Sequence, residues 1–78
     1  MSKRLINVEE VANQFTLSKA SVNYYTNIGL LTVYAKKGNQ RLYDRDDVAQ
    51  RLGKIKEMMK IGYTLRLIQR EFLLKGNT

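Results

Sequence analysis

The sequence contains no cysteine and no histidine. Without cysteine there can be no disulfide and no thiolate metal site, and without histidine there is no imidazole ligand and no histidine acid–base catalysis. The usual nucleophile–base pairs cannot be assembled from the remaining residues, and no phosphate-binding glycine loop is present. We therefore expect neither an enzyme nor a metal or other cofactor.

The chain also lacks proline and any long apolar run. Its apolar stretches are a few residues long, far below the roughly 20 residues that span a bilayer. Residues 1–15 do not contain the apolar segment of a signal peptide, so we expect a cytoplasmic protein with no membrane partner. Because proline is absent, glycines and capping side chains must mark the ends of helices.

Positive charge is in excess. The 78 residues carry 14 basic and 7 acidic side chains, a net charge of +7, and residues 32–78 hold eleven of the basic ones and five of the acidic ones. A chain of this length forms a single domain over residues 1–78. The excess of positive charge favours a polyanionic partner. A basic surface with no such partner explains the net charge equally well.

Residues 7–29 have the pattern of a helix-turn-helix. Asn7 and Glu10 have the spacing of a capping box, and Ser18 can cap a second helix that ends before Gly29. One face of the first helix is apolar: Val8, Val11, Ala12 and Phe15. Two short helices joined by about three residues constitute this motif.

The outward face of the second helix is small and polar and carries no carboxylate. A surface that meets DNA phosphates should lack negative charge, although an ordinary surface helix can have the same composition. The candidates for contacts with base edges are Lys19, Ser21, Asn23 and Asn27. An asparagine can pair bidentately with adenine in the major groove.

Residues 32–43 predict a basic β-hairpin. β-Branched and aromatic residues flank a turn at Gly38-Asn39, with Lys36 and Lys37 at the tip and Arg41 on the return strand. Such a hairpin after a helix-turn-helix is a wing, but lysines on a two-stranded edge also prevent aggregation. The predicted fold is mostly α: a winged helix-turn-helix of four helices, with a two-stranded hairpin between the second and the third.

The third and fourth helices are predicted over about residues 44–61 and 64–74. Asp44 caps the third helix, which ends at Gly62, and Thr64 caps the fourth. The expected buried side chains are Val48, Leu52, Ile55 and Met59 on the third helix and Leu65, Ile68 and Phe72 on the fourth. The candidates for phosphate contacts are Lys36, Lys37, Arg41 and Lys60, with the hydroxyls of Tyr24 and Tyr43.

Four segments, in this order and at this spacing, resemble the N-terminal DNA-binding domain of MerR-type transcription regulators. They are residues 6–12, 22–31, 38–43 and 62–68, and the resemblance extends over about residues 5–73. It implies double-stranded DNA as the partner, with the second helix in the major groove and the hairpin on the phosphate backbone. Matched positions imply that Tyr24, Tyr25, Arg41 and Tyr43 lie at the DNA surface, and that Lys60 is the basic residue often found near the end of the third helix.

The chain departs from the family pattern at three positions. Asn23 replaces a usual arginine, Thr26 a usual acidic residue and Thr32 a usual proline. Full-length members continue into a coiled-coil helix that forms the dimer, and then into an effector domain. The resemblance therefore implies a homodimer formed through a segment outside this sequence and an indirect action on RNA polymerase. The sequence is either a piece of a longer protein or a stand-alone domain.

Three functions remain open on the sequence alone. The first is sequence-specific DNA binding in transcription regulation. The second is a small DNA-architectural role, of the excisionase, packaging or segregation kind, in which several copies coat or bend DNA. The third is a basic protein-interaction module for an acidic partner.

Overall fold

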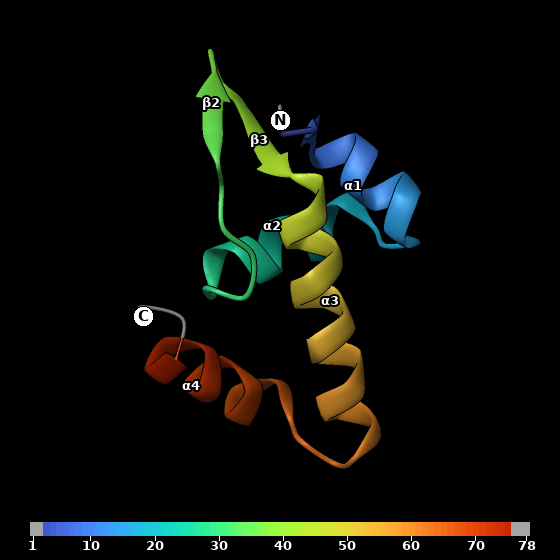
Figure 1. Cartoon of the computed structure of the whole chain (residues 1–78), viewed down its shortest axis with the longest axis vertical. Coiled ribbons are helices and arrows are strands. Elements are labelled where there is room, and N and C mark those ends of the chain that lie inside the picture. Colours follow the sequence, from blue (N-terminus) through green and yellow to red (C-terminus); the bar gives the residue numbers. More distant parts are fainter. Residues whose placement is uncertain (1–2, 76–78) are drawn as a thin grey trace.

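The computed structural model describes residues 3–75 and contains four helices and three short strands (Figure 1). The helices are α1 (Val8–Phe15), α2 (Lys19–Asn27), α3 (Arg45–Lys60) and α4 (Leu65–Lys75). The strands are β1 (Leu5–Asn7), β2 (Ala35–Lys37) and β3 (Gln40–Asp44). The predicted mostly α fold class, with a hairpin between the second and third helices, is confirmed.

The hairpin belongs to a three-stranded antiparallel sheet in the order β1-β3-β2. Ile6 of β1 lies opposite Tyr43 of β3, and Lys36 of β2 lies opposite Arg41. The prediction of a two-stranded hairpin missed β1. Three residues are too few to show the alternation of a strand, and β1 exists because β3 offers it a free edge.

Capping side chains set the helix starts as the sequence predicts. The Asn7 side chain accepts a hydrogen bond from the Glu10 backbone at 2.8 Å, and the Glu10 carboxylate accepts one from the Asn7 backbone at 2.9 Å. Asp44 caps α3 by accepting from the backbone N–H of Asp46. Each contact satisfies a backbone N–H that the first helical turn leaves unpaired.

One hydrophobic core joins the inner faces of the helices to the sheet. Its buried members are Ile6, Val11, Ala12, Val22, Leu30, Leu31, Tyr43, Val48, Leu52, Ile55 and Ile68. Met59 was expected in this core but is exposed, and the neighbouring Met58 packs against the core instead. Helical periodicity allows either methionine to be buried, and α4 covers the side on which Met58 lies.

The fourth helix turns back toward the end of α2 (Figure 1). Ile68 of α4 is fully buried, while Leu65 and Phe72 are partly buried against the core. The Gln69 side chain donates a hydrogen bond to the Ile28 carbonyl at the C-terminus of α2, at 3.0 Å. Helix α4 therefore supports α2 from below and leaves the outward face of α2 uncovered.

Candidate nucleic-acid interface

Helix α2 projects a polar face into solvent from a firmly packed base. The Ser18 hydroxyl oxygen caps its N-terminus by accepting from the Ser21 backbone at 3.0 Å, and Gly29, at φ 87°, follows its C-terminal end. Val22 is fully buried beneath the helix, whereas Asn23 and Asn27 are exposed on the other side. The burial of one face thus fixes which side chains point outward.

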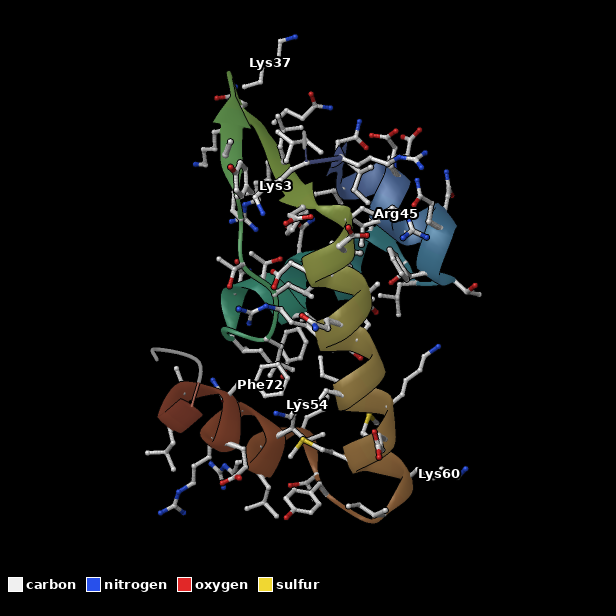
Figure 2. The ribbon with its side chains drawn as sticks, in the orientation of Figure 1. Lys3, Lys37, Arg45, Lys54, Lys60 and Phe72 are labelled. Carbon is white, nitrogen blue, oxygen red and sulfur yellow. The ribbon has the colours of Figure 1, made fainter. Side chains whose placement is uncertain are left out.

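The wing is formed by β2, β3 and the turn at Gly38, whose φ of 62° favours glycine. Lys36 and Lys37 are exposed, and Figure 2 shows Lys37 at the free end of the hairpin. Because Lys36 lies directly opposite Arg41, these two cations share one face of the wing. On β3 that face also includes Tyr43, two residues from Arg41.

Arg41 joins the wing to α2. Its guanidinium donates hydrogen bonds to the side-chain oxygens of Asn23, at 3.5 Å, and of Asn27, at 3.4 Å. A hollow of about 430 Å³ lies beside this contact, where α2 and the wing meet the start of α1. Its lining residues are Asn7, Val8, Glu9, Lys19, Asn23, Asn39, Gln40 and Arg41. We call the surface formed by Lys19, Asn23, Asn27, Asn39, Gln40 and Arg41 the helix–wing surface.

The N-terminal part of α2 carries two further candidates, Lys19 and Ser21. The Lys19 ammonium pairs with the Glu9 carboxylate at 3.2 Å, and both side chains are largely exposed. Such an exposed pair contributes at most about 1 kcal/mol, so Lys19 is free to exchange Glu9 for a phosphate or a base. The Ser21 hydroxyl is half-buried and accepts from the Ser18 hydroxyl at 3.0 Å, which leaves its own hydrogen available.

The two adjacent tyrosines of α2 lie in different environments. Tyr24 is 52% exposed, while Tyr25 is half-buried and packs against the core. Their ring centroids are 6.2 Å apart and the rings are tilted by 48°. Tyr24 therefore presents its hydroxyl to solvent, and Tyr25 mainly supports the helix.

The prediction that the Tyr43 hydroxyl contacts phosphate is wrong in this structure. Tyr43 is fully buried, and its hydroxyl oxygen lies 2.8 Å from Oγ1 of Thr26. Thr26 in turn donates its single hydroxyl hydrogen to the Val22 carbonyl at 2.8 Å, so Tyr43 must be the donor in the pair. The tyrosine fastens β3 to α2 from the inside and fixes the side of β3 from which Arg41 projects.

Lys60 lies apart from the other candidates. It occupies the last turn of α3, at the opposite end of the molecule from Lys37 along its long axis (Figure 2). The structure does not join Lys60 to the helix–wing surface.

Two polar residues of the helix–wing surface are not among the contact residues that the sequence predicts. Asn39 and Gln40 line the hollow, whereas the sequence pattern indicates only a turn at Gly38-Asn39. Their position beside Gly38, at the tip of a basic hairpin, was the available signal. Turn residues at a hairpin tip are exposed and can reach a ligand that the hairpin approaches.

An ion pair fixes the base of the wing. The Lys3 ammonium lies 3.0 Å from the Asp44 carboxylate and 5.5 Å from the centre of the Tyr34 ring. The hydrogen bond from Lys3 holds the pKa of Asp44 below its usual range, with help from the backbone N–H of Asp46, and the same bond raises the pKa of Lys3. Asp44 thus both caps α3 and ties the N-terminal segment to β3.

Within residues 3–75, no group of three or more acidic side chains is placed to hold a metal ion. In the same part of the chain, none of the helices combines the length and apolar character needed to cross a bilayer. The side chains of the helix–wing surface carry amide, ammonium and guanidinium groups.

Comparison with known proteins identifies the family. The crystal structure of a transcriptional regulator of the MerR family from Bacillus cereus is similar, with a TM-score of 0.73 and 28% sequence identity. The match covers 90% of this chain and 52% of that one, so the present chain spans about half the length of that protein. No curated protein matches the chain. Residues 6–74 match the family model described as MerR HTH family regulatory protein, and the chain therefore belongs to the MerR HTH family.

Proposed function

We propose that this chain binds double-stranded DNA sequence-specifically in transcription regulation, with α2 in the major groove and the wing along the phosphate backbone. One observation carries the proposal: Arg41 of β3 contacts both Asn23 and Asn27 of α2, so helix and wing present one continuous polar surface. The Bacillus cereus protein of similar structure is a transcriptional regulator, which supports the same function.

The surface divides into groups that position the protein and groups that read bases. Lys36, Lys37 and Arg41 on the wing neutralise phosphates, and the exposed Tyr24 hydroxyl donates to another. Lys60 contacts a separate stretch of backbone. The side chains of α2 that reach base edges are Lys19, Ser21, Asn23 and Asn27, with Tyr25 supporting the helix beneath them.

The charge balance of this region favours a polyanion. Lys19 and Arg41 line the hollow together with the Glu9 carboxylate, which pairs with Lys19, and Lys36 and Lys37 add two exposed cations on the wing. A duplex phosphate can replace Glu9 at little cost, because the Lys19–Glu9 pair is solvent-exposed.

A salt titration of duplex binding tests the proposal. Fluorescence anisotropy with a labelled random-sequence duplex should give a log–log slope of about −4 if four or five phosphates are contacted. Arg41→Ala should weaken binding to all duplexes and reduce the slope by about one. A salt-independent response of the wild-type protein would exclude the DNA-binding function and favour the acidic protein partner.

Lys54 offers a matched control for the loss of one charge. Its ammonium lies 6.0 Å from the centre of the Phe72 ring, in the hollow between α3 and α4 (Figure 2). Lys54→Gln should therefore leave the salt slope unchanged. A reduced slope in this variant would show that the titration reports net charge and not contacts of the wing.

The partners of the whole protein belong to the same proposal. We expect a homodimer formed through a segment outside this sequence and an indirect effect on RNA polymerase. Large apolar side chains near the C-terminal end of the described residues are exposed, as on a surface that a partner covers: Met59, Ile61, Leu67 and Leu74. Cooperative coating of DNA by many copies would favour the architectural role over transcription regulation.

A further inference from the structure

The guanidinium of Arg41 lies between two carboxamides of one helix face. Asn23 and Asn27 are four residues apart, so their side chains are neighbours on the surface of α2. Two different nitrogens of Arg41, Nη1 and Nη2, each contact one carboxamide oxygen, at 3.5 and 3.4 Å. The planar fork of arginine can hold both amides at once, which a lysine ammonium cannot do in this geometry.

The position of Arg41 is itself fixed from inside the protein. Tyr43 lies on the same face of β3, is fully buried, and is hydrogen-bonded to Thr26 of α2. Residues two apart on a strand project to the same side, so the burial of Tyr43 directs Arg41 toward α2. The contact between Arg41 and the asparagines therefore follows from the packing of the wing.

This contact determines which atoms the asparagines can offer. A guanidinium has only hydrogen-bond donors, so each carboxamide must turn its oxygen toward Arg41 and its NH₂ group away. Bidentate pairing with adenine needs both the oxygen and the NH₂ group of one asparagine on the same base edge. While Arg41 holds the two oxygens, only the NH₂ groups point outward.

We propose that Arg41 is a positioning residue that sets base preference through Asn23 and Asn27. Held in this way, the two amides are donors, and they select guanine and thymine, whose O6 and O4 atoms are acceptors in the major groove. Adenine offers a donating amide only its N7 acceptor, next to the N6 amino group where guanine has O6, and cytosine offers an N4 amino group, so both bases are disfavoured. The inference rests on the proposed function, in which α2 enters the major groove.

Arg41→Lys separates this role from charge. Lysine keeps the positive charge for a phosphate but cannot hold both carboxamides, so the amides become free to rotate and to pair with adenine. Lys36→Gln is the matched control, because Lys36 lies directly opposite Arg41 on the neighbouring strand and, within residues 3–75, is not hydrogen-bonded to Asn23 or Asn27. It should lower affinity and salt slope without changing base preference.

Selection from a randomised 20-base-pair duplex library, followed by sequencing, measures base preference. We expect the wild-type protein to prefer guanine or thymine over adenine by about fivefold or more at the two positions read by α2. With Arg41→Lys, adenine should rise to within about twofold of them, while the salt slope stays unchanged. With Lys36→Gln, the motif should stay as in the wild type.

A second measurement needs no DNA. In nuclear magnetic resonance spectra of the free protein, Arg41→Lys should shift the side-chain NH₂ signals of Asn23 and Asn27, and Lys36→Gln should not. An unchanged motif in Arg41→Lys, or unmoved NH₂ signals, would overturn the positioning role and leave DNA binding intact. If the wild-type protein shows no salt-dependent duplex binding, the proposed function fails and the base preference fails with it.

Discussion

The hydrogen bond between Tyr43 and Thr26 allows a sharp test of how the wing is attached to α2. Tyr43 is fully buried and donates to Thr26, whose own hydrogen goes to the Val22 carbonyl. The two partners are therefore not equivalent. Loss of Thr26 removes the acceptor of a buried donor, whereas loss of the Tyr43 hydroxyl leaves Thr26 with its bond to the helix backbone.

This asymmetry sets the expected magnitudes. Tyr43→Phe removes one hydrogen bond and should lower the free energy of unfolding by about 0.5–1.5 kcal/mol. Thr26→Val keeps the side-chain shape but leaves the buried Tyr43 hydroxyl without an acceptor, which should cost about 1–3 kcal/mol. The double variant has no unsatisfied hydroxyl, so its loss should be smaller than the sum of the two single losses.

Urea unfolding followed by circular dichroism measures these differences, with thermal midpoints as a check. For a domain of this size, 1 kcal/mol corresponds to roughly 4–8 °C in Tm. Two outcomes would refute this account of the pair. The first is a Thr26→Val variant as stable as Tyr43→Phe or more stable. The second is a double variant that loses as much stability as the two single variants together, or more.

The same Tyr43→Phe variant also tests the corrected assignment of this residue. A buried hydroxyl cannot reach phosphate, so the variant should bind duplex DNA with an unchanged salt slope at temperatures where it is folded. A reduced slope would show that Tyr43 contacts the backbone after all.

Three further results are expected. Asn7→Ala removes the side-chain oxygen that accepts from the Glu10 backbone N–H and should destabilise the protein by about 1 kcal/mol in urea unfolding. Gly29→Ala should also destabilise the protein, by roughly 1 kcal/mol, because the φ of 87° at this position is unfavourable for alanine. A steric clash is not the cause, since the nearest atom to an added Cβ, on Leu73, lies at an ordinary 3.7 Å. The pKa of Asp44 is lowered in the folded protein, so its contribution to stability is fully present above the usual aspartate pKa. That contribution is lost as the pH falls through the lower folded-state pKa. On acidification, the urea midpoint of the wild type should therefore fall more steeply than that of Asp44→Asn.

Two substitutions elsewhere serve as controls for the first two results. Asn13 is exposed within α1, so Asn13→Ala should leave stability unchanged or raise it slightly, because alanine favours helix. Gly53 lies inside α3 with open space around an added Cβ, and Gly53→Ala should stabilise the protein by about 0.5–1 kcal/mol. If Gly53→Ala and Gly29→Ala destabilise the protein equally, positive φ is not the cause of the stability loss in Gly29→Ala.

Local signals were sufficient to predict the helices and the hairpin. Asn7, Ser18 and Asp44 cap the helices that they were expected to cap, because capping depends on residues only two or three positions apart. The turn at Gly38 is likewise a local feature. The resemblance to the MerR family could also be recognised from the sequence, because it consists of short local motifs at fixed spacing.

Features that depend on distant segments were predicted poorly. Strand β1 exists through its pairing with β3, and Met58 rather than Met59 is covered because of where α4 packs. The sequence predicts Tyr43 at the surface, because its local sequence does not show that its hydroxyl is hydrogen-bonded to Thr26 of α2.

The sequence alone determined the chemistry that the protein can use: a cationic, amide-rich and hydroxyl-rich surface without cysteine or histidine, on helices bounded by local caps. Tertiary structure alone decided how these groups are combined. It placed Arg41 against Asn23 and Asn27, which are 18 and 14 residues distant in the chain. The physical reason is that hydrogen-bond direction and burial depend on which surfaces meet, and composition and periodicity do not specify that.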